Sequence, residues 1–324
     1  MKICIFTPHR PHFGNILTQL SFCCALRQQH PHAVISIYSK TDNSKLITEC
    51  GAADELVVYN KTGFLKLVKQ LRQRQFDTIY NLYPGSEKTH LAVCLSGAKE
   101  KHTLTCPSVL KNRYTSSLEM VKGNQYIGRY LLALLNQVEG SHYSPSIISQ
   151  LASQPRHSMD ENALTLIPGG GAGAFKRWNI EKYCAAATSI KEAKSSIKCI
   201  NYILGPDEAD YEDIILNHHT GDNVLIIKSP SIPELISIAL QSRLTISNDC
   251  GPAHIFQMLE VPLIMIWGWE TQKNTSPMHA MNEWFHSSEH SWSIIPNDET
   301  KSINSISVDK VVSLALAELG RNRI

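Results

Sequence analysis

The sequence predicts an α/β protein made of two Rossmann-like domains, each with a parallel sheet flanked by helices. Three observations lead to this fold class. Short β-branched runs alternate with helical stretches in the first half of the chain, the alternation lapses around residues 140–162, and it then restarts. Strands that are joined through helices form right-handed crossovers and therefore a parallel sheet. We expect one domain over residues 1–150 and a second over residues 151–324.

The elements of the first domain follow from hydrophobic periodicity, because strands repeat every two residues and helices every 3.6. The expected strands lie near residues 2, 33, 55 and 77, and the expected helices span residues 14–29, 43–51 and 63–75. The stretch over residues 140–162 is rich in Ser, Pro, His and Gln and is interpreted as a linker or domain boundary.

The helix expected over residues 63–75 is basic and amphipathic. One face is expected to carry Leu65, Val68 and Leu71, and the others carry Lys66, Lys69, Arg72 and Arg74. A solvated helix face is the simplest interpretation of this pattern. Basic residues beside a cleft could also bind an acidic glycolipid, and a basic amphipathic helix could rest on an anionic membrane.

The second domain shows the same alternation with clearer boundaries. The expected strands span residues 163–168, 199–205, 223–229, 244–249 and 262–268, and the expected helices span 179–194, 207–218, 231–242, 251–260 and 307–319. The histidine- and tryptophan-containing stretch over 278–292 is interpreted as a loop lining a donor pocket. A metal site is disfavoured there because no pair except His286 and His290 has i, i+4 spacing with a matching acid ligand.

The composition excludes several classes of protein. The 324 residues are 43% hydrophobic and 19% charged, with a formal net charge of +2, which indicates a globular protein that does not bind nucleic acid generally. The nine cysteines form no C-x-x-C pair, so we expect reduced thiols rather than metal ligands. The apolar run that opens the chain is too short for a signal peptide, and no run reaches about 18 apolar residues, so a soluble cytoplasmic protein is expected.

Unusual residues follow three strands of the second domain, and after the strand over 199–205 these include Glu208. A glycine-rich run with Gly170 and Gly171 leads to Lys176, and the strand over 244–249 is followed by Gly251 and His254. In open α/β sheets, ligands bind beyond the carboxyl ends of the strands. Glycines let N–H groups approach phosphate oxygens, lysine adds positive charge, and a helix N-terminus near Gly251 favours an anion. We therefore predict a nucleotide diphosphate site.

Each of these residues also has a simpler interpretation. The glycine run could be a flexible turn or an NAD fingerprint, although residues 176–178 intervene before the helix that such a fingerprint should open directly. Asp249 could be only a helix N-cap, and His254 a core histidine. Glu208 suits a ribose diol, but Asp207 and Glu208 could be only first-turn acids that complement a helix dipole. The convergence of three strand ends favours ligand binding.

Four segments together resemble the heptosyltransferases of glycosyltransferase family nine. Residues 247–268 resemble the S-D-T-G-x-x-H segment of that family, 168–190 its K-x-W block, 204–214 its G-G-P-x-E segment, and 14–26 its opening helix. The segments occur in the family's order and cover nearly the whole chain. The D-x-G-x-x-H and K-x-W motifs are fairly specific at this separation, whereas the others are weak.

The resemblance implies a GT-B fold, with two Rossmann-like domains facing across a cleft. It implies inverting transfer of heptose from ADP-heptose to the lipopolysaccharide inner core, without a metal or cofactor. The protein would work in the cytoplasm of a Gram-negative bacterium, either free or in peripheral contact with the inner face of the inner membrane. The resemblance also implies site roles: Asp249, Gly251 and His254 at the diphosphate, Lys176 on a phosphate, and Glu208 or Asp207 at the ribose.

The chain departs from the family pattern at several positions. Gly and Ala occupy the phosphate loop where the family has Thr or Ser, Cys250 replaces Thr, and Asn179 replaces Pro. Most importantly, Asn15 stands where the family's opening Gly-Asp places its proposed catalytic acid.

An inverting transfer needs a general base to accept the acceptor proton, and an amide cannot serve. Asn15 could still orient a hydroxyl or a water molecule. Histidine has a suitable pKa near neutrality, so His12 is the leading candidate, with His9 as an alternative. Both could equally be loop histidines without a role. Three functions therefore remain open: a sugar transferase, a non-catalytic nucleotide-sugar-binding relative, and a nucleotide-sugar epimerase.

Overall fold

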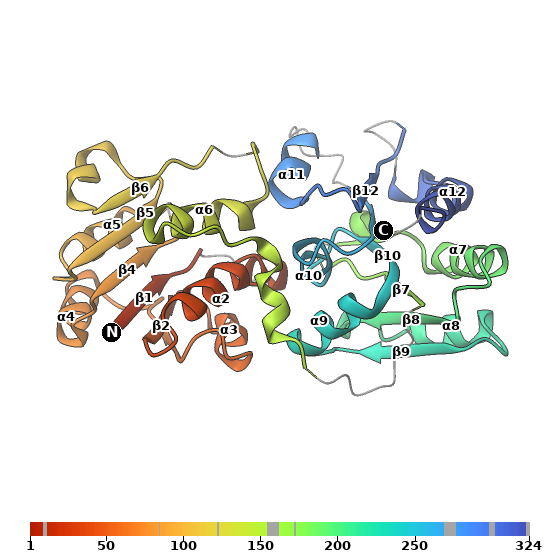
Figure 1. Cartoon of the computed structure of the whole chain (residues 1–324), viewed down its shortest axis with the longest axis horizontal. Helices are drawn as coiled ribbons and strands as arrows, with labels where there is room; N and C mark the ends of the chain where they lie inside the picture. The colour runs from red at the N-terminus through yellow and green to blue at the C-terminus, as the bar shows by residue number, and fades with distance from the viewer. Residues whose placement is uncertain are drawn as a thin grey trace. The chain divides into compact units, whose positions relative to one another are not determined.

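The chain folds into two compact units, Met1–Leu151 and Ala152–Ile324, in its computed structural model (Figure 1). The structure describes residues 1–8, 12–83, 85–121, 123–153, 162–171, 173–268, 277–297 and 302–321, with the backbone alone described for 277–280. Each unit contains one six-stranded sheet whose strands pair in parallel. The expected α/β class with parallel sheets is confirmed.

The sheet of the first unit has the strand order β3-β2-β1-β4-β5-β6. This is a doubly wound order, in which the direction of winding reverses between β1 and β4. The strands are β1 (Lys2–Phe6), β2 (Val34–Ser39), β3 (Glu55–Val58), β4 (Thr78–Asn81), β5 (Glu100–Leu104) and β6 (Ser116–Leu118). The first four lie where they were expected, whereas β5 and β6 were not foreseen.

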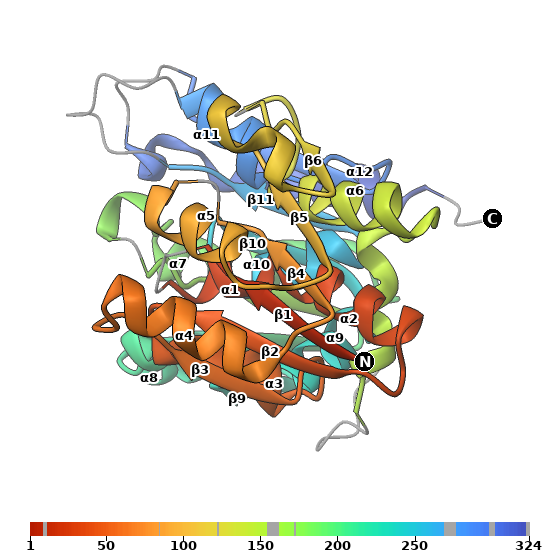
Figure 2. The same ribbon diagram turned by 90° about the vertical axis from the view of Figure 1, so that its left-hand side faces the viewer.

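Helices cover both faces of this sheet. The helices α4 and α5 pack against one another on one face, and α2 and α6 pack together on the other (Figure 2). The helices are α1 (Phe13–Leu17), α2 (Leu20–Gln29), α3 (Lys45–Glu49), α4 (Phe64–Arg74), α5 (Glu87–Cys94) and α6 (Ile127–Glu139). The 3₁₀ segment Pro145–Leu151 contacts α2, where the Gln150 amide donates to the carbonyl of Cys24 at 3.2 Å.

The structure corrects two expectations in this unit. The helix expected over 14–29 is interrupted after Leu17, where the side chains of Thr18 and Gln19 both donate to the carbonyl oxygen of Asn15. Such bonds compete with the helical ladder. In α4, Leu65 was expected on the buried face but is 80% exposed. The buried stripe runs instead through Leu67, Val68 and Leu71, because Leu65 lies roughly 110° around the helix from the centre of that stripe.

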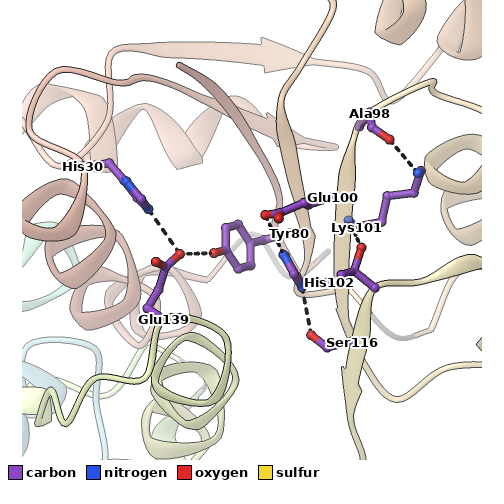
Figure 3. A network of polar contacts seen from close by, with 9 residues as sticks. His30, Tyr80, Ala98, Glu100, Lys101, His102, Ser116 and Glu139 are labelled. Carbon is purple, nitrogen blue, oxygen red and sulfur yellow. Dashed lines mark hydrogen bonds and ion pairs between the residues drawn. The ribbon is translucent and has the colours of Figure 1, made fainter.

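A partly buried polar cluster lies in the first unit (Figure 3). The Tyr80 hydroxyl donates to Glu139 Oε1 at 2.8 Å, and His30 Nε2 lies 3.1 Å from the same oxygen. The Tyr80 ring packs against that of His102, whose Nδ1 lies 2.8 Å from the Ser116 hydroxyl. Burial lowers the pKa of His102 and raises that of Tyr80. The cluster links the ends of α2 and α6 to the strands β4, β5 and β6.

The sheet of the second unit repeats the same strand order. It runs β12-β11-β10-β7-β8-β9, so in both sheets the first and fourth strands of the unit are central neighbours. The winding reverses between β7 and β10. The strands are β7 (Ala163–Ile167), β8 (Cys199–Leu204), β9 (Val224–Lys228), β10 (Ser242–Asn248), β11 (Leu263–Ile266) and β12 (Ser291–Ile294).

The helices of the second unit complete the doubly wound fold. They are α7 (Ile180–Ala193), α8 (Tyr211–His218), α9 (Ile232–Gln241), α10 (Ala253–Met258), α11 (Pro277–Trp284) and α12 (Val308–Leu319). Buried residues of α7, α8 and α12 share one core with the strands, around the fully buried Trp178. The expectation of a loop over 278–292 is wrong, because the helix α11 and the strand β12 form there. The helix expected from Gly251 begins only at Ala253.

Three general features hold for the described part of the chain. All nine cysteines are free, and five of them are buried, which agrees with reduced thiols. No group of three or more His, Cys, Asp or Glu side chains that could hold a metal ion occurs among the described residues. None of the described helices is long and apolar enough to cross a membrane.

Candidate functional site

Asn248 organises the point in the second unit where the winding of the sheet reverses. It ends β10, is fully buried, and its amide nitrogen donates to the carbonyl of Pro168 at 2.7 Å. Its carbonyl oxygen accepts from the main-chain N–H of Trp178 at 3.3 Å and from the Tyr183 hydroxyl at 3.0 Å. One side chain therefore joins β10 to both ends of the glycine-rich loop. The sequence-based prediction gave Asn248 no role. Its position, a polar amide at the end of an apolar strand, is the signal that could have identified it.

The glycine-rich loop runs from β7 to α7 and is packed tightly at one end. A Cβ at Gly170 would lie 2.9 Å from Arg177 Cγ, and one at Gly268, just beyond β11, would overlap the carbonyl oxygen of Phe175. A Cβ at Gly171 would instead meet no atom within 4 Å. The loop therefore packs directly against Gly268, whereas the Gly171 backbone borders open space that a ligand can approach.

Lys176 and Asp249 form an ion pair at the ends of neighbouring strands. Lys176 closes the glycine-rich loop after β7, Asp249 follows β10, and the Lys176 ammonium bonds the Asp249 carboxylate. The two side chains are 25% and 10% exposed, so the pair is only partly reached by solvent. An ammonium group has three donors, so this bond leaves Lys176 further donors for a second anion.

His254 lies beside this ion pair, in the first turn of α10. It is 4% exposed, and burial lowers its pKa to about 4 despite the opposing effect of Asp249. Its ring makes an edge contact with Trp284, with centroids 5.9 Å apart. The imidazole is therefore neutral near pH 7, and it can donate from only one ring nitrogen. Its main-chain N–H bonds the carbonyl of Gly251 at 3.1 Å.

The two acids that follow β8, Asp207 and Glu208, differ in their exposure and in their contacts. Glu208 is 4% exposed, and its carboxylate accepts from the N–H of Gly205 at 2.9 Å. A Cβ at Gly169 would lie 3.1 Å from this carboxylate, so Glu208 borders the start of the glycine-rich loop. Asp207 is 64% exposed and lies 3.8 Å from Arg177. Of the two, Glu208 is the acid that the fold holds at the loop.

The structure gives a physical reason for one departure from the family pattern, Asn179, and shows the surroundings of another, Cys250. Asn179 caps α7, because its side chain accepts from the N–H of Glu181 at 2.8 Å. Its own N–H donates to Asn304 at 2.7 Å, a bond that proline could not make. The thiol of Cys250 lies 3.5 Å from the Ser247 hydroxyl, and burial raises its pKa to about 11. Cys250 is therefore a neutral thiol near pH 7.

The residues predicted for catalysis lie after β1 in the first unit. His12 is exposed and immediately precedes α1, with no side-chain capping bond. Asn15 is partly buried in α1. The carbonyl of His12 accepts from the N–H of Asn15 at 3.0 Å, so one turn holds both residues. His9, the alternative base, lies outside the described residues. In this doubly wound sheet, β1 borders the point where the winding reverses, which is where such folds bind ligands.

The comparisons with known proteins agree on family and fold. Residues 64–304 match the model of "Glycosyltransferase family 9 (heptosyltransferase)". No curated protein matches the sequence significantly.

Three solved structures share the fold over 98% of the chain. A Veillonella parvula glycosyl transferase family 9 protein has TM-score 0.67 and 17% identity, with 97% of its own chain covered. The E. coli heptosyltransferase WaaC with ADP has TM-score 0.68 and 14% identity, with 100% covered. E. coli ADP-heptose lps heptosyltransferase II has TM-score 0.64 and 17% identity, with 98% covered. The predicted GT-B class is therefore confirmed.

Proposed function

Because the chain belongs to glycosyltransferase family 9, we propose that it transfers a sugar from a nucleotide diphosphate sugar to a glycan acceptor. One observation carries the proposal most directly: the Lys176–Asp249 ion pair lies beside the glycine-rich loop where the sheet winding reverses. We propose ADP-heptose as the donor and lipopolysaccharide or a related cell-surface glycan as the acceptor. An E. coli neighbour that carries ADP supports the nucleotide.

The donor site would hold the diphosphate between a cation and main-chain groups. Asp249 orients the ammonium of Lys176, which then gives its remaining donors to phosphate oxygens. The N–H groups around Gly170 and Gly171 would approach the phosphates without a Cβ in the way. These groups would hold the phosphates by hydrogen bonds, and we propose that the transfer uses neither a metal ion nor a cofactor.

The remaining donor contacts would come from Glu208, Gly251 and His254. The buried Glu208 carboxylate would accept from the ribose hydroxyls, as acids do in dinucleotide-binding folds. Gly251 keeps the turn before α10 free of a side chain, and His254, neutral at pH 7, would donate one N–H to a phosphate oxygen.

The acceptor hydroxyl would attack the sugar's anomeric carbon directly while the bond to the diphosphate oxygen breaks, which inverts that centre and releases the nucleotide diphosphate. His12 would take the hydroxyl proton as the new bond forms, and Asn15 would orient the hydroxyl or a water molecule. Exposed Lys66 and Lys69 on α4 suit an acidic acceptor or a peripheral contact with the inner face of the inner membrane, which is where we propose that the protein works.

A direct test incubates the protein with ADP-heptose and a heptose-free lipopolysaccharide core. Mass spectrometry is expected to show the acceptor gaining one heptose, with release of ADP. Release of free heptose or of an epimer without acceptor would favour an epimerase or a hydrolase. Binding of ADP without any product from a panel of nucleotide sugars would contradict the transferase function.

That last outcome would support the second candidate, a nucleotide-sugar-binding relative that does not catalyse transfer. One observation favours it: Asn15, which cannot accept a proton, is held in α1 where the family pattern has an acid. A thermal shift screen against ADP, UDP, GDP and CMP identifies the bound nucleotide in either case, because selective binding stabilises the folded state.

A further inference from the structure

Behind His254, the side chain of Gln257 forms the centre of a short chain of buried polar groups. Gln257 is fully buried in α10, three residues after His254 and hence on the same side of the helix. Its Nε2 lies 3.3 Å from His254 Nδ1. At its other end, Gln257 Oε1 accepts from the main-chain N–H of His286 at 2.7 Å.

The contact with His286 fixes which way the Gln257 amide points. A main-chain N–H can only donate, so the Gln257 atom that meets it must be the carbonyl oxygen. The amide nitrogen, which has only hydrogens to give, therefore faces His254 Nδ1. A ring nitrogen that accepts a hydrogen bond carries no proton. The neutral His254 ring must then carry its proton on Nε2.

The two other protonation states of His254 conflict with the same contact. A ring protonated on Nδ1 would point its N–H at the hydrogens of the Gln257 amide. The doubly protonated imidazolium would do the same, because both of its nitrogens are donors. Burial disfavours the imidazolium as well, since it holds the pKa of His254 at about 4. Geometry and burial therefore select the same tautomer.

We propose that Gln257 is a positioning residue for nucleotide binding, which fixes His254 as the Nε2-protonated tautomer so that Nε2 meets the diphosphate as a donor. A lone pair at that position would repel a phosphate oxygen, whereas an N–H attracts it. The choice of ligand rests on the proposed function, but the tautomer does not. The main-chain N–H of His286, just after α11, orients the Gln257 amide and thereby determines which ring nitrogen of His254 is the donor.

The tautomer can be measured directly by NMR on the wild-type protein labelled with ¹⁵N-histidine, without nucleotide. The sequence contains 14 histidines, so the spectrum of His254→Gln identifies the His254 signals by their loss. We expect Nε2 to resonate as a protonated, pyrrole-type nitrogen and Nδ1 as an unprotonated, pyridine-type nitrogen at pH 7. A protonated Nδ1 would overturn the inference, whatever the protein binds.

A pair of variants then tests the link to binding. Gln257→Glu keeps the size and the acceptor for His286, but it places an acceptor opposite Nδ1. The proton is expected to move onto Nδ1, and ADP affinity to fall about ten- to a hundredfold, as for a lost bond to a charged group. In His254→Gln, the glutamine amide nitrogen itself supplies a donor near the position of Nε2. In that background, Gln257→Glu is expected to change ADP affinity less than threefold.

Two results would contradict this coupling: unchanged ring-nitrogen signals in Gln257→Glu, or an equal loss of ADP affinity in both backgrounds. Circular dichroism checks that each variant is folded, and if Gln257→Glu is not, the wild-type spectrum still decides the tautomer. If the wild-type protein has the expected tautomer but does not bind ADP, the proposed function fails while the assignment of Gln257 to the His254 tautomer stands.

Discussion

At the residue scale, the charge at the candidate site is already balanced before a ligand arrives. Lys176 and Asp249 neutralise one another in a partly buried place, where an unpaired charge is costly. A diphosphate bound there would share the ammonium rather than replace the carboxylate. In the proposed site Asp249 would thus act by orienting Lys176, since a carboxylate in direct contact with phosphate would repel it.

The first prediction concerns these donor residues. Lys176→Ala and His254→Ala are each expected to weaken ADP binding by roughly 1.5–3 kcal/mol, because each removes a hydrogen bond to a charged group. Isothermal titration calorimetry measures the change. Lys191→Ala is the matched control, because Lys191 is 24% exposed and pairs with Asp222, away from the glycine-rich loop. Unchanged affinity in both site variants, with the fold intact, would refute the phosphate assignment.

The second prediction concerns the general base. His12→Ala is expected to lower kcat about a hundred- to ten-thousandfold, which is the usual loss when a general base is removed. Nucleotide affinity should be preserved, because the proposed donor residues all belong to the other unit. Asn15→Asp is expected to raise the rate by supplying the missing acid. Full activity of His12→Ala in an active enzyme would assign the base to His9 or to an acid in the first unit.

The third prediction is a dependence of stability on pH. The pKa of His254 is about 4 in the folded protein, against 6.5 for an unperturbed histidine. Between these values the unfolded state binds a proton that the folded state does not, so stability falls as pH drops from 6.5 towards 4. The loss is on the order of 3 kcal/mol at most.

Urea unfolding of wild type and His254→Gln at pH 7.5, 6 and 5 isolates this effect. Burial also lowers the pKa of His102 and His219, so acid destabilises both proteins, and only the difference between them belongs to His254. The wild-type protein should lose more stability between pH 7.5 and pH 5. Parallel pH profiles in the two proteins would show that His254 is not buried as a neutral ring.

At the element scale, the sequence predicted the strands whose apolar runs are long and uninterrupted, and it missed those carrying polar residues. The strand β5 (Glu100–Leu104) contains Lys101 and the buried His102, and the Ser116 hydroxyl that contacts His102 lies on the next strand, β6. Likewise, β12 reads Ser-Trp-Ser-Ile and is recognisable only from its pairing with β11. The candidate residues at strand ends were predictable, because the carboxyl ends of parallel strands meet at one edge of the sheet. Asn248 and Gln257 were not, because their contacts with Pro168 and His286 join segments that are far apart in the sequence.

The fourth prediction compares two glycines in neighbouring elements. Gly268→Ala is expected to destabilise the protein by about 1–3 kcal/mol, because its Cβ would overlap the Phe175 carbonyl in the glycine-rich loop. Gly171→Ala has open space around its Cβ and should leave stability within about 0.5 kcal/mol of wild type. Urea unfolding measures both. If a phosphate approaches the backbone there, Gly171→Ala still weakens ADP binding; an unaltered affinity would place the ligand elsewhere.

At the scale of the whole molecule, each unit contains the parts of a complete domain. Each has its own six-stranded sheet and its own buried core. The contact boundary falls between Leu151 and Ala152. All residues proposed for the nucleotide belong to the second unit, and both residues proposed for proton transfer belong to the first.

The fifth prediction follows from this division. A protein that begins at Ala152 and contains the second unit alone is expected to fold and to bind ADP within about threefold of the full chain. It should catalyse no transfer. Circular dichroism shows whether the isolated unit is folded, and calorimetry measures its affinity for ADP. If the isolated unit is folded but its affinity for ADP is lost, residues of the first unit must contribute to the nucleotide site.

The repeated strand order also bears on how such a chain can change over evolutionary time. A crossover between related genes near the codons for Leu151 and Ala152 would exchange one whole sheet and leave the other uninterrupted. Hybrids made at this junction would inherit the loop around Lys176 from one parent and the turn around His12 from the other. Recombination could thus give an established nucleotide site a new partner half without a single substitution in either core.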